Sequence, residues 1–185
     1  METMLLEDFI MEGVAFIPYY MPSYGESTKF LFEDGSFRVS TVSSRTFLQR
    51  IHRFFGMDNM AMKQKLGREI GRKNLIPLPF SRHWTLVPFK VRKPIGNQPA
   101  YGWVLSHSIL EMKEESRIRT TLLLTGSHQL TVLQSFGSCQ SQMRNVKLVE
   151  YYFHDLHQKM DRIFERRLRI YPMTNRHQNS TDTEL

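Results

Sequence analysis

The chain has 185 residues, enough for one domain with a substantial core, and its 41% hydrophobic and 12% aromatic residues exclude a disordered polyelectrolyte. Its single cysteine excludes an internal disulfide, and no apolar run approaches the length of a membrane-spanning helix. Residues 1–12 are acidic and lack the positive charge of a signal peptide, so we expect a cytoplasmic protein with no membrane partner.

The formal net charge of +7 is concentrated in residues 45–93. This segment holds 12 of the 25 Lys and Arg residues and only two acidic residues, Asp58 and Glu69, so its local charge is +10 and the rest of the chain is at −3. Such localisation indicates a polyanionic partner. The competing interpretation is a solvated basic face on an ordinary domain.

The first forty residues predict an antiparallel meander. Strands are expected over residues 13–20, 28–32 and 36–41, and Asp34-Gly35 is typical of a tight hairpin turn. We interpret residues 1–12 as a short strand or a frayed leader.

Two short helices follow. Ser43 or Ser44 caps the first helix and Gly56 ends it, whereas Asp58 caps a basic second helix that Gly71 ends. The short turn between them gives the outline of a helix-turn-helix. The first helix has an apolar stripe of Phe47, Leu48, Ile51, Phe54 and Phe55, and we expect Phe54, Phe55 and Trp103 to lie in the core.

Residues 75–93 change character because Pro77, Pro79 and Pro88 forbid a helix and favour extended or edge-strand backbone. Strands are expected at residues 84–87 and 101–110. Residues 117–124 and 129–133 predict a hairpin.

A long helix is predicted over residues 141–168, with an apolar seam at heptad-like spacing. The seam either packs on the protein's own sheet or forms a dimer contact. We therefore expect an α+β fold: a single domain, residues 1–173, with an antiparallel sheet, a basic helical insert and a long C-terminal helix, followed by a disordered tail at 174–185. The seam residues are Val146, Val149, Phe153, Leu156, Met160 and Ile163.

Signatures of catalysis are sparse. No glycine-rich loop has the spacing of a phosphate-binding motif, and Cys139 has no motif around it. His154 and His157 could form one edge of a metal site, but no further ligand accompanies them. We expect no enzymatic activity, no cofactor and no metal.

Several motifs resemble the ComK family of competence transcription factors of Gram-positive bacteria. Arg53-Phe54-Phe55-Gly56 resembles its RFFG motif, and Gly71-Arg72-Lys73-Asn74 resembles its basic stretch before a proline step. Two later elements match in order: Gly102-Trp103 with Ser106-His107, and Leu168 to Pro172. The resemblance covers about residues 38–172.

The resemblance implies a transcriptional activator of DNA-uptake genes that binds AT-rich boxes, largely through the minor groove, as dimers that form tetramers. It implies an indirect link to RNA polymerase, and control by a MecA-type adaptor that delivers the protein to the ClpC–ClpP protease. Adaptor docking would map to Leu168, Ile170, Tyr171 and Pro172, although Arg169 stands where the family has an apolar residue.

Basic side chains would contact phosphates, and arginine is favoured in a narrow AT-rich minor groove. Arg68, Arg72, Arg82 and Arg92 are the candidates for insertion, while Ile76, Pro77 and Pro79 could wedge or buttress. The open alternatives are an RNA-binding, membrane-surface or protein-interaction module. The full set of predicted DNA-binding residues is Arg53, Lys63, Lys65, Arg68, Arg72, Lys73, Arg82, Lys90, Arg92 and Lys93.

Overall fold

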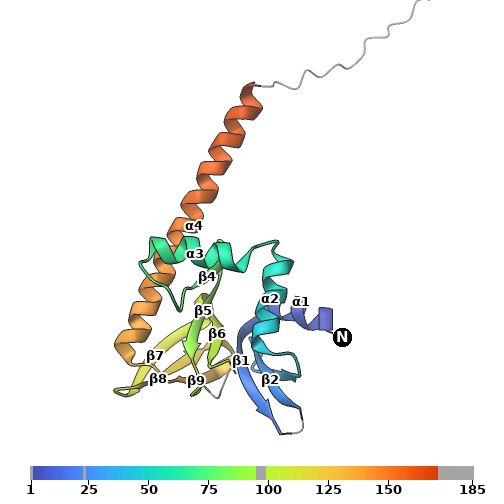
Figure 1. Cartoon of the computed structure of the whole chain (residues 1–185), viewed down its shortest axis with the longest axis vertical. Helices are drawn as coiled ribbons and strands as arrows, with labels where there is room; N and C mark the ends of the chain where they lie inside the picture. The colour runs from blue at the N-terminus through green and yellow to red at the C-terminus, as the bar shows by residue number, and fades with distance from the viewer. Residues whose placement is uncertain (1, 23, 95–98, 171–185) are drawn as a thin grey trace, which may run out of the picture. The chain divides into compact units, whose positions relative to one another are not determined.

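The computed structural model of the chain describes residues 2–22, 24–94 and 99–170 (Figure 1). The chain divides into two compact units, residues 1–153 and a second unit that begins at His154. In chain order the elements are α1 (Glu2–Glu12), β1 (Gly13–Met21), β2 (Gly25–Phe32), β3 (Phe37–Ser40), α2 (Ser44–Phe54), α3 (Asn59–Glu69), β4 (Leu78–Ser81), β5 (Trp84–Lys90), β6 (Tyr101–Leu105), β7 (Ile109–Ser116), β8 (Arg119–Leu124), β9 (His128–Val132) and α4 (Phe136–Ile170), with 3₁₀ turns at Ser106–Ser108 and Thr125–Ser127.

The α+β fold class is confirmed. The strands form a six-stranded antiparallel sheet in the order β3-β2-β1-β6-β5-β4 and a three-stranded antiparallel sheet in the order β7-β8-β9. The predicted meander and the hairpin of β8 and β9 are both present. The single strand expected over residues 101–110 is wrong, because the 3₁₀ turn at Ser106–Ser108 splits it between the two sheets.

Both faces of the central part of the six-stranded sheet are buried. Phe16 of β1 packs in an aromatic cluster with residues of α1 and α2, whereas the next residue, Ile17, packs in a second cluster with the three-stranded sheet and the start of α4. Because side chains alternate between the faces of a strand, a strand between two cores must be apolar on both sides. This layering places α2, and through it α3, on one face of the sheet.

The N-terminal segment differs from the sequence prediction. Residues 2–12 form helix α1 rather than a strand or a frayed leader. Phe9 is 0% exposed, and its ring centroid lies 5.5 Å from that of Phe16, 5.9 Å from Phe30 and 5.4 Å from Phe47. The helix forms because its apolar side chains, Leu5, Leu6 and Phe9, recur at helical spacing and have an aromatic cluster to pack against.

The two-helix prediction is confirmed, including its caps. The Ser43 hydroxyl accepts a hydrogen bond from the Thr46 amide at 3.1 Å, and the Asp58 carboxylate accepts one from the Ala61 amide at 2.7 Å. Gly56 and Gly71 both adopt positive φ after the last helical turns. Residues 55–58 join α2 to α3, and the two helices run in clearly different directions (Figure 1).

The core prediction for Phe54 is wrong, since this side chain is 53% exposed. The last buried residue of α2 is His52 rather than Phe54. A polar side chain therefore lies on the face of the helix that otherwise packs against the core. Phe55 and Trp103 are half-buried and pack against the aromatic cluster, so they are core-edge residues.

The proline-rich segment forms an edge, as the sequence predicts. Pro79 lies in β4, which is an edge strand. Ile76, Pro77 and Pro79 are all buried, which excludes a role as wedges in a nucleic acid and leaves the buttressing role. Ile76 packs with Leu66 of α3 and Val149 of α4, so this segment forms part of the apolar contact that holds the basic helix in place.

Helix α4 begins five residues earlier than predicted and spans both units. In the first unit, Val146 and Val149 of the predicted seam are buried in the protein's own core. In the second unit, Met160 and Ile163 of the same seam are more than half exposed. The predicted tail at 174–185 lies outside the described residues. Among the described residues, we find no helix with the length and apolar character to cross a membrane.

His52 is a polar side chain at an apolar position. It is 3% exposed, its ring lies 4.9 Å from that of Phe80, and both ring nitrogens lack a hydrogen-bond partner among the described residues. The pKa of His52 is lowered from 6.5 to about 4, chiefly by burial and also by the charge of Lys63, while the charge of Asp58 acts in the opposite direction.

This lowered pKa predicts a loss of stability in mild acid. Between pH 6.5 and 4 only the unfolded chain takes up the proton, so acidification should reduce the free energy of unfolding by up to about 3 kcal/mol. His52→Leu should remove that part of the pH dependence, measured by urea unfolding across this range. His83→Gln, at an exposed turn, is the control. Equal pH slopes for the wild type and His52→Leu would contradict the assignment.

Candidate nucleic-acid interface

Helix α3 has one buried and one exposed side. Leu66 is buried against Ile76 and Val149, and Gly67 is also buried. The opposite side exposes Gln64, Lys65 and Arg68. The helix is thus fixed to the domain through a narrow apolar contact, and Gln64, Lys65 and Arg68 face outward.

The basic loop that follows α3 folds back against the helix. The Arg72 amide donates a hydrogen bond to the Gly67 carbonyl at 2.8 Å. A Cβ atom at Gly67 would lie 2.5 Å from the Arg72 carbonyl oxygen and 2.9 Å from the Ile76 side chain. The close approach therefore requires glycine at position 67, and it is what brings Arg72 and Lys73 alongside the helix.

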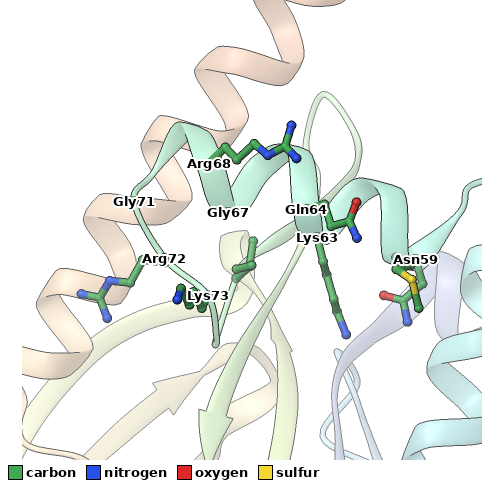
Figure 2. Close-up of a pocket in the computed structure, with 10 residues that line it drawn as sticks. Asn59, Lys63, Gln64, Gly67, Arg68, Gly71, Arg72 and Lys73 are labelled. Atoms are coloured by element: carbon green, nitrogen blue, oxygen red, sulfur yellow. The ribbon is translucent and has the colours of Figure 1, made fainter.

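The helix and loop enclose a basic groove, an open depression of ≈ 580 Å³. It contains four of the predicted DNA-binding cations and no acidic residue. Figure 2 shows that these side chains spread apart: Arg68 extends from the outer side of α3, Arg72 points away from the loop, and Lys63 points toward the strands. The groove is lined by Asn59, Met60, Lys63, Gln64, Gly67, Arg68, Gly71, Arg72, Lys73 and Ile76.

This spread decides what the groove can bind. Cations that converge on one point chelate a single anion, whereas cations that diverge over a surface contact several anions at separate positions. The arrangement in Figure 2 is of the second kind and suits a polyanion with regularly spaced charges.

Two lysines of α3 lie against aromatic rings. The Lys63 ammonium lies 5.9 Å from the centroid of Trp103, and the Lys65 ammonium lies 5.7 Å from the centroid of Tyr152. Lys63 is half-buried, and burial lowers its pKa from the ordinary value. Lys65 is exposed and does not line the basic groove, so the predicted DNA-binding cations of α3 do not all lie in this depression.

A second groove of ≈ 620 Å³ adjoins the first and shares Lys63, Lys73 and Ile76 with it. We call it the aromatic groove, because Tyr101 and Trp103 of β6 also line it. The sequence prediction did not include these two residues as site residues. Their alternation at positions 101 and 103 of one strand is the signal that could have placed them on one face. The remaining lining residues are Asn74, Leu75 and Pro88.

The other predicted cations lie outside both grooves. Arg53 is exposed at the end of α2, Arg82 is exposed in the turn between β4 and β5, and Lys93 is exposed beyond β5. Lys90 is half-buried at the end of β5. The remaining one, Arg92, is half-buried, and its Nε donates a hydrogen bond to the Pro99 carbonyl at 2.7 Å, which ties it to its own loop.

The predicted adaptor-docking element lies at the end of the described residues. Leu168 and Ile170 belong to the last turn of α4, where only the backbone is described. Tyr171 and Pro172 lie outside the described residues.

Neither a reactive cysteine nor a metal site is formed by the described residues. Cys139 is buried, and burial raises the pKa of its thiol. Among the described residues, no group of His, Cys, Asp and Glu side chains is arranged to hold a metal ion.

Comparisons of the chain with protein-family models, with curated proteins and with solved structures found no match.

The close contact at Gly67 yields a prediction. Gly67→Ala should push the Arg72 carbonyl away and break the hydrogen bond from the Arg72 amide, although alanine adds about 1 kcal/mol of intrinsic helix stability. Hydrogen–deuterium exchange of the amides at 72–74 should accelerate in this variant. Gly137→Ala, in a helix where an added Cβ meets nothing within 4 Å, is the matched control. Unchanged exchange in Gly67→Ala would show that the loop does not depend on this contact.

Proposed function

We propose that the protein binds double-stranded DNA through the basic groove. The observation that carries the proposal is that α3 and the loop after it arrange Lys63, Arg68, Arg72 and Lys73 around one open depression without an opposing carboxylate. Each cation can neutralise a phosphate and release its condensed counterion, which is the main source of affinity for a duplex. The protein is a non-enzymatic binding protein in this proposal.

Arginine and lysine have different parts in this contact. Arg68 and Arg72 are the candidates for entering a narrow AT-rich minor groove, because guanidinium is weakly hydrated and that groove is strongly negative. Lys63 and Lys73 lie between the helix and the sheet and are placed for phosphates at the edge of the site.

More specifically, we propose a ComK-like transcriptional activator of DNA-uptake genes, working in the cytoplasm and associated with the nucleoid when bound. The positions of the resemblance motifs support this: residues 53–56 cover the end of α2 and the start of the turn to α3, residues 71–74 lie in the basic loop, and Trp103 lines the aromatic groove. RNA polymerase as an indirect partner, and the MecA-type adaptor with ClpC–ClpP, remain predictions from that resemblance.

The test is a charge-removal variant titrated against salt. Arg72→Ala with Lys73→Ala should weaken binding to an AT-rich duplex and reduce the slope of log K against log salt by about 2, since each phosphate contact contributes about −0.9. Arg117→Ala with Arg119→Ala removes the same charge from the exposed turn of β7 and β8 and is the control. Fluorescence anisotropy measures both variants, and circular dichroism confirms their folding.

The proposal fails if the folded loop variant binds the AT-rich duplex with wild-type affinity and slope. A GC-rich duplex of equal length tests the AT preference: equal affinity for both would remove the minor-groove part. A preference for double-stranded RNA over the DNA would favour the RNA-binding alternative.

We also propose that the protein is a homo-oligomer, a dimer or tetramer, that pairs through α4. Three apolar side chains in the second unit, Met160, Ile163 and Phe164, are each more than half exposed on a helix whose heptad-like seam reaches this point. Apolar residues at such spacing are buried when two helices form a coiled coil.

Met160→Lys with Ile163→Lys should therefore shift the protein to monomer, because two charges in a seam oppose pairing. Sedimentation velocity over a range of protein concentrations measures the change. Gln158→Lys, on an exposed position away from the seam, adds charge to the same helix and should leave the oligomer intact. A wild-type protein that is monomeric at all concentrations would refute the pairing.

A further inference from the structure

We propose that the aromatic groove binds single-stranded DNA by stacking an unpaired base on Tyr101, with the adjoining phosphates on Lys63 and Lys73. The inference rests on the proposed nucleic-acid function of the neighbouring basic groove. It adds a second form of the ligand, an unpaired strand rather than a duplex, and a stacking contact on Tyr101, while Lys63 and Lys73 are shared by the two proposals.

The strand register places the aromatic side chains on one face. Tyr101 and Trp103 are two residues apart on β6, so their side chains share a face of the six-stranded sheet. Their partners across β5 are Lys90 and Pro88, and directly opposed residues lie on the same face. The face therefore carries two rings, a proline and a lysine in adjacent positions, with Tyr101 39% exposed and open to a ligand.

The two rings differ in what they can do. Trp103 is half-buried and is stacked on Phe16 at a centroid distance of 6.5 Å, which fixes its plane against the aromatic cluster. Tyr101 lies on the same face of β6 and is the more exposed of the two rings. A ligand ring can therefore reach Tyr101, while Trp103 keeps a fixed position beside it and needs little rearrangement on binding.

Charge in the groove matches a nucleotide rather than an apolar ligand. Lys63 and Lys73 line both grooves, and the aromatic groove includes no acidic residue. The Lys63 ammonium lies between α3 and the Trp103 ring. A base provides the flat aromatic surface and its phosphate the anion, and this pairing of stacking with cations is how proteins bind single strands.

One wall of the aromatic groove is held in an uncommon conformation. Leu75 has a positive φ of 55°, which costs free energy for a residue with a branched side chain. Its carbonyl accepts a hydrogen bond at 2.7 Å from the amide nitrogen of Gln142, a buried side chain of α4 that also lies 3.4 Å from the Pro88 carbonyl. Gln142 thus ties two lining residues together and shapes the groove before any ligand enters.

The size of the groove is compatible with this ligand. Sites for small molecules commonly enclose about 300–1,000 Å³. The volume of ≈ 620 Å³ lies within that range and leaves room for a nucleotide together with water. A double helix cannot present a base face there, because its bases are stacked on each other.

The experiment compares single-stranded and duplex DNA on the full chain. Tyr101→Ala should weaken binding of a short oligothymidine by about tenfold, within the range of base–aromatic stacking, and leave AT-rich duplex affinity within about twofold. Tyr101→Phe keeps the ring and should bind like the wild type. Tyr24→Ala removes a ring that is 70% exposed at the β1–β2 hairpin and should have no effect.

A second readout does not depend on affinity differences. Trp84 packs in the aromatic cluster, so Trp84→Phe leaves Trp103 as the remaining tryptophan of the chain. In this variant oligothymidine should quench tryptophan fluorescence on binding, and the duplex should not.

The outcomes separate the two proposals. Wild-type oligothymidine affinity in a folded Tyr101→Ala variant, or no quenching of Trp103, overturns the stacking site while the duplex proposal stands. Tighter binding of oligouridine than of oligothymidine also overturns it, because the site would then be one for RNA. Absence of binding to any nucleic acid refutes the proposed function itself.

Discussion

The position of the candidate site depends on the ring of Phe9. This ring lies at the centre of an aromatic cluster and contacts Phe16 of β1, Phe30 of β2 and Phe47 of α2. It therefore joins the N-terminal helix, the sheet and the first helix of the two-helix pair in one packing unit. Through the four residues that connect α2 to α3, the same packing fixes where the basic helix begins. Loss of a buried phenylalanine ring typically costs 3–5 kcal/mol, which indicates how strongly this arrangement is held.

A second set of contacts holds α3 and the loop after it in the arrangement that forms the basic groove. Gly67 allows the loop to return to α3, and Leu66 and Ile76 attach the helix to Val149 of α4. Gln142 of the same helix holds the Leu75 carbonyl. The apolar contacts supply the stability. Arg68, Arg72 and Lys73 remain exposed, so solvent reduces their mutual repulsion, whereas Lys63 is half-buried beside them. A polyanion would relieve that repulsion further, which is the physical basis of both proposals.

Local signals in the sequence were informative wherever the structure is made by nearby residues. The caps at Ser43 and Asp58 and the turn glycines after α2 and α3 are at the predicted positions. Failures occurred where distant residues decide. Phe54 continues the apolar stripe of α2 but faces solvent, because the cluster has space for His52 instead. The strand expected over residues 101–110 is divided, because the chain leaves one sheet for the other after Leu105.

The sequence by itself determined the α+β class, the two capped helices and the concentration of positive charge in residues 45–93, since periodicity, capping and charge are properties of neighbouring residues. Only the tertiary structure decided which cations act together. It placed Lys63, Arg68, Arg72 and Lys73 around one groove and tied Arg92 to Pro99. It also brought Tyr101 and Trp103 beside that groove, although they are about thirty residues away in the chain. The reason is that strand pairing and the close approach at Gly67 are set by packing between distant segments, which local patterns do not encode.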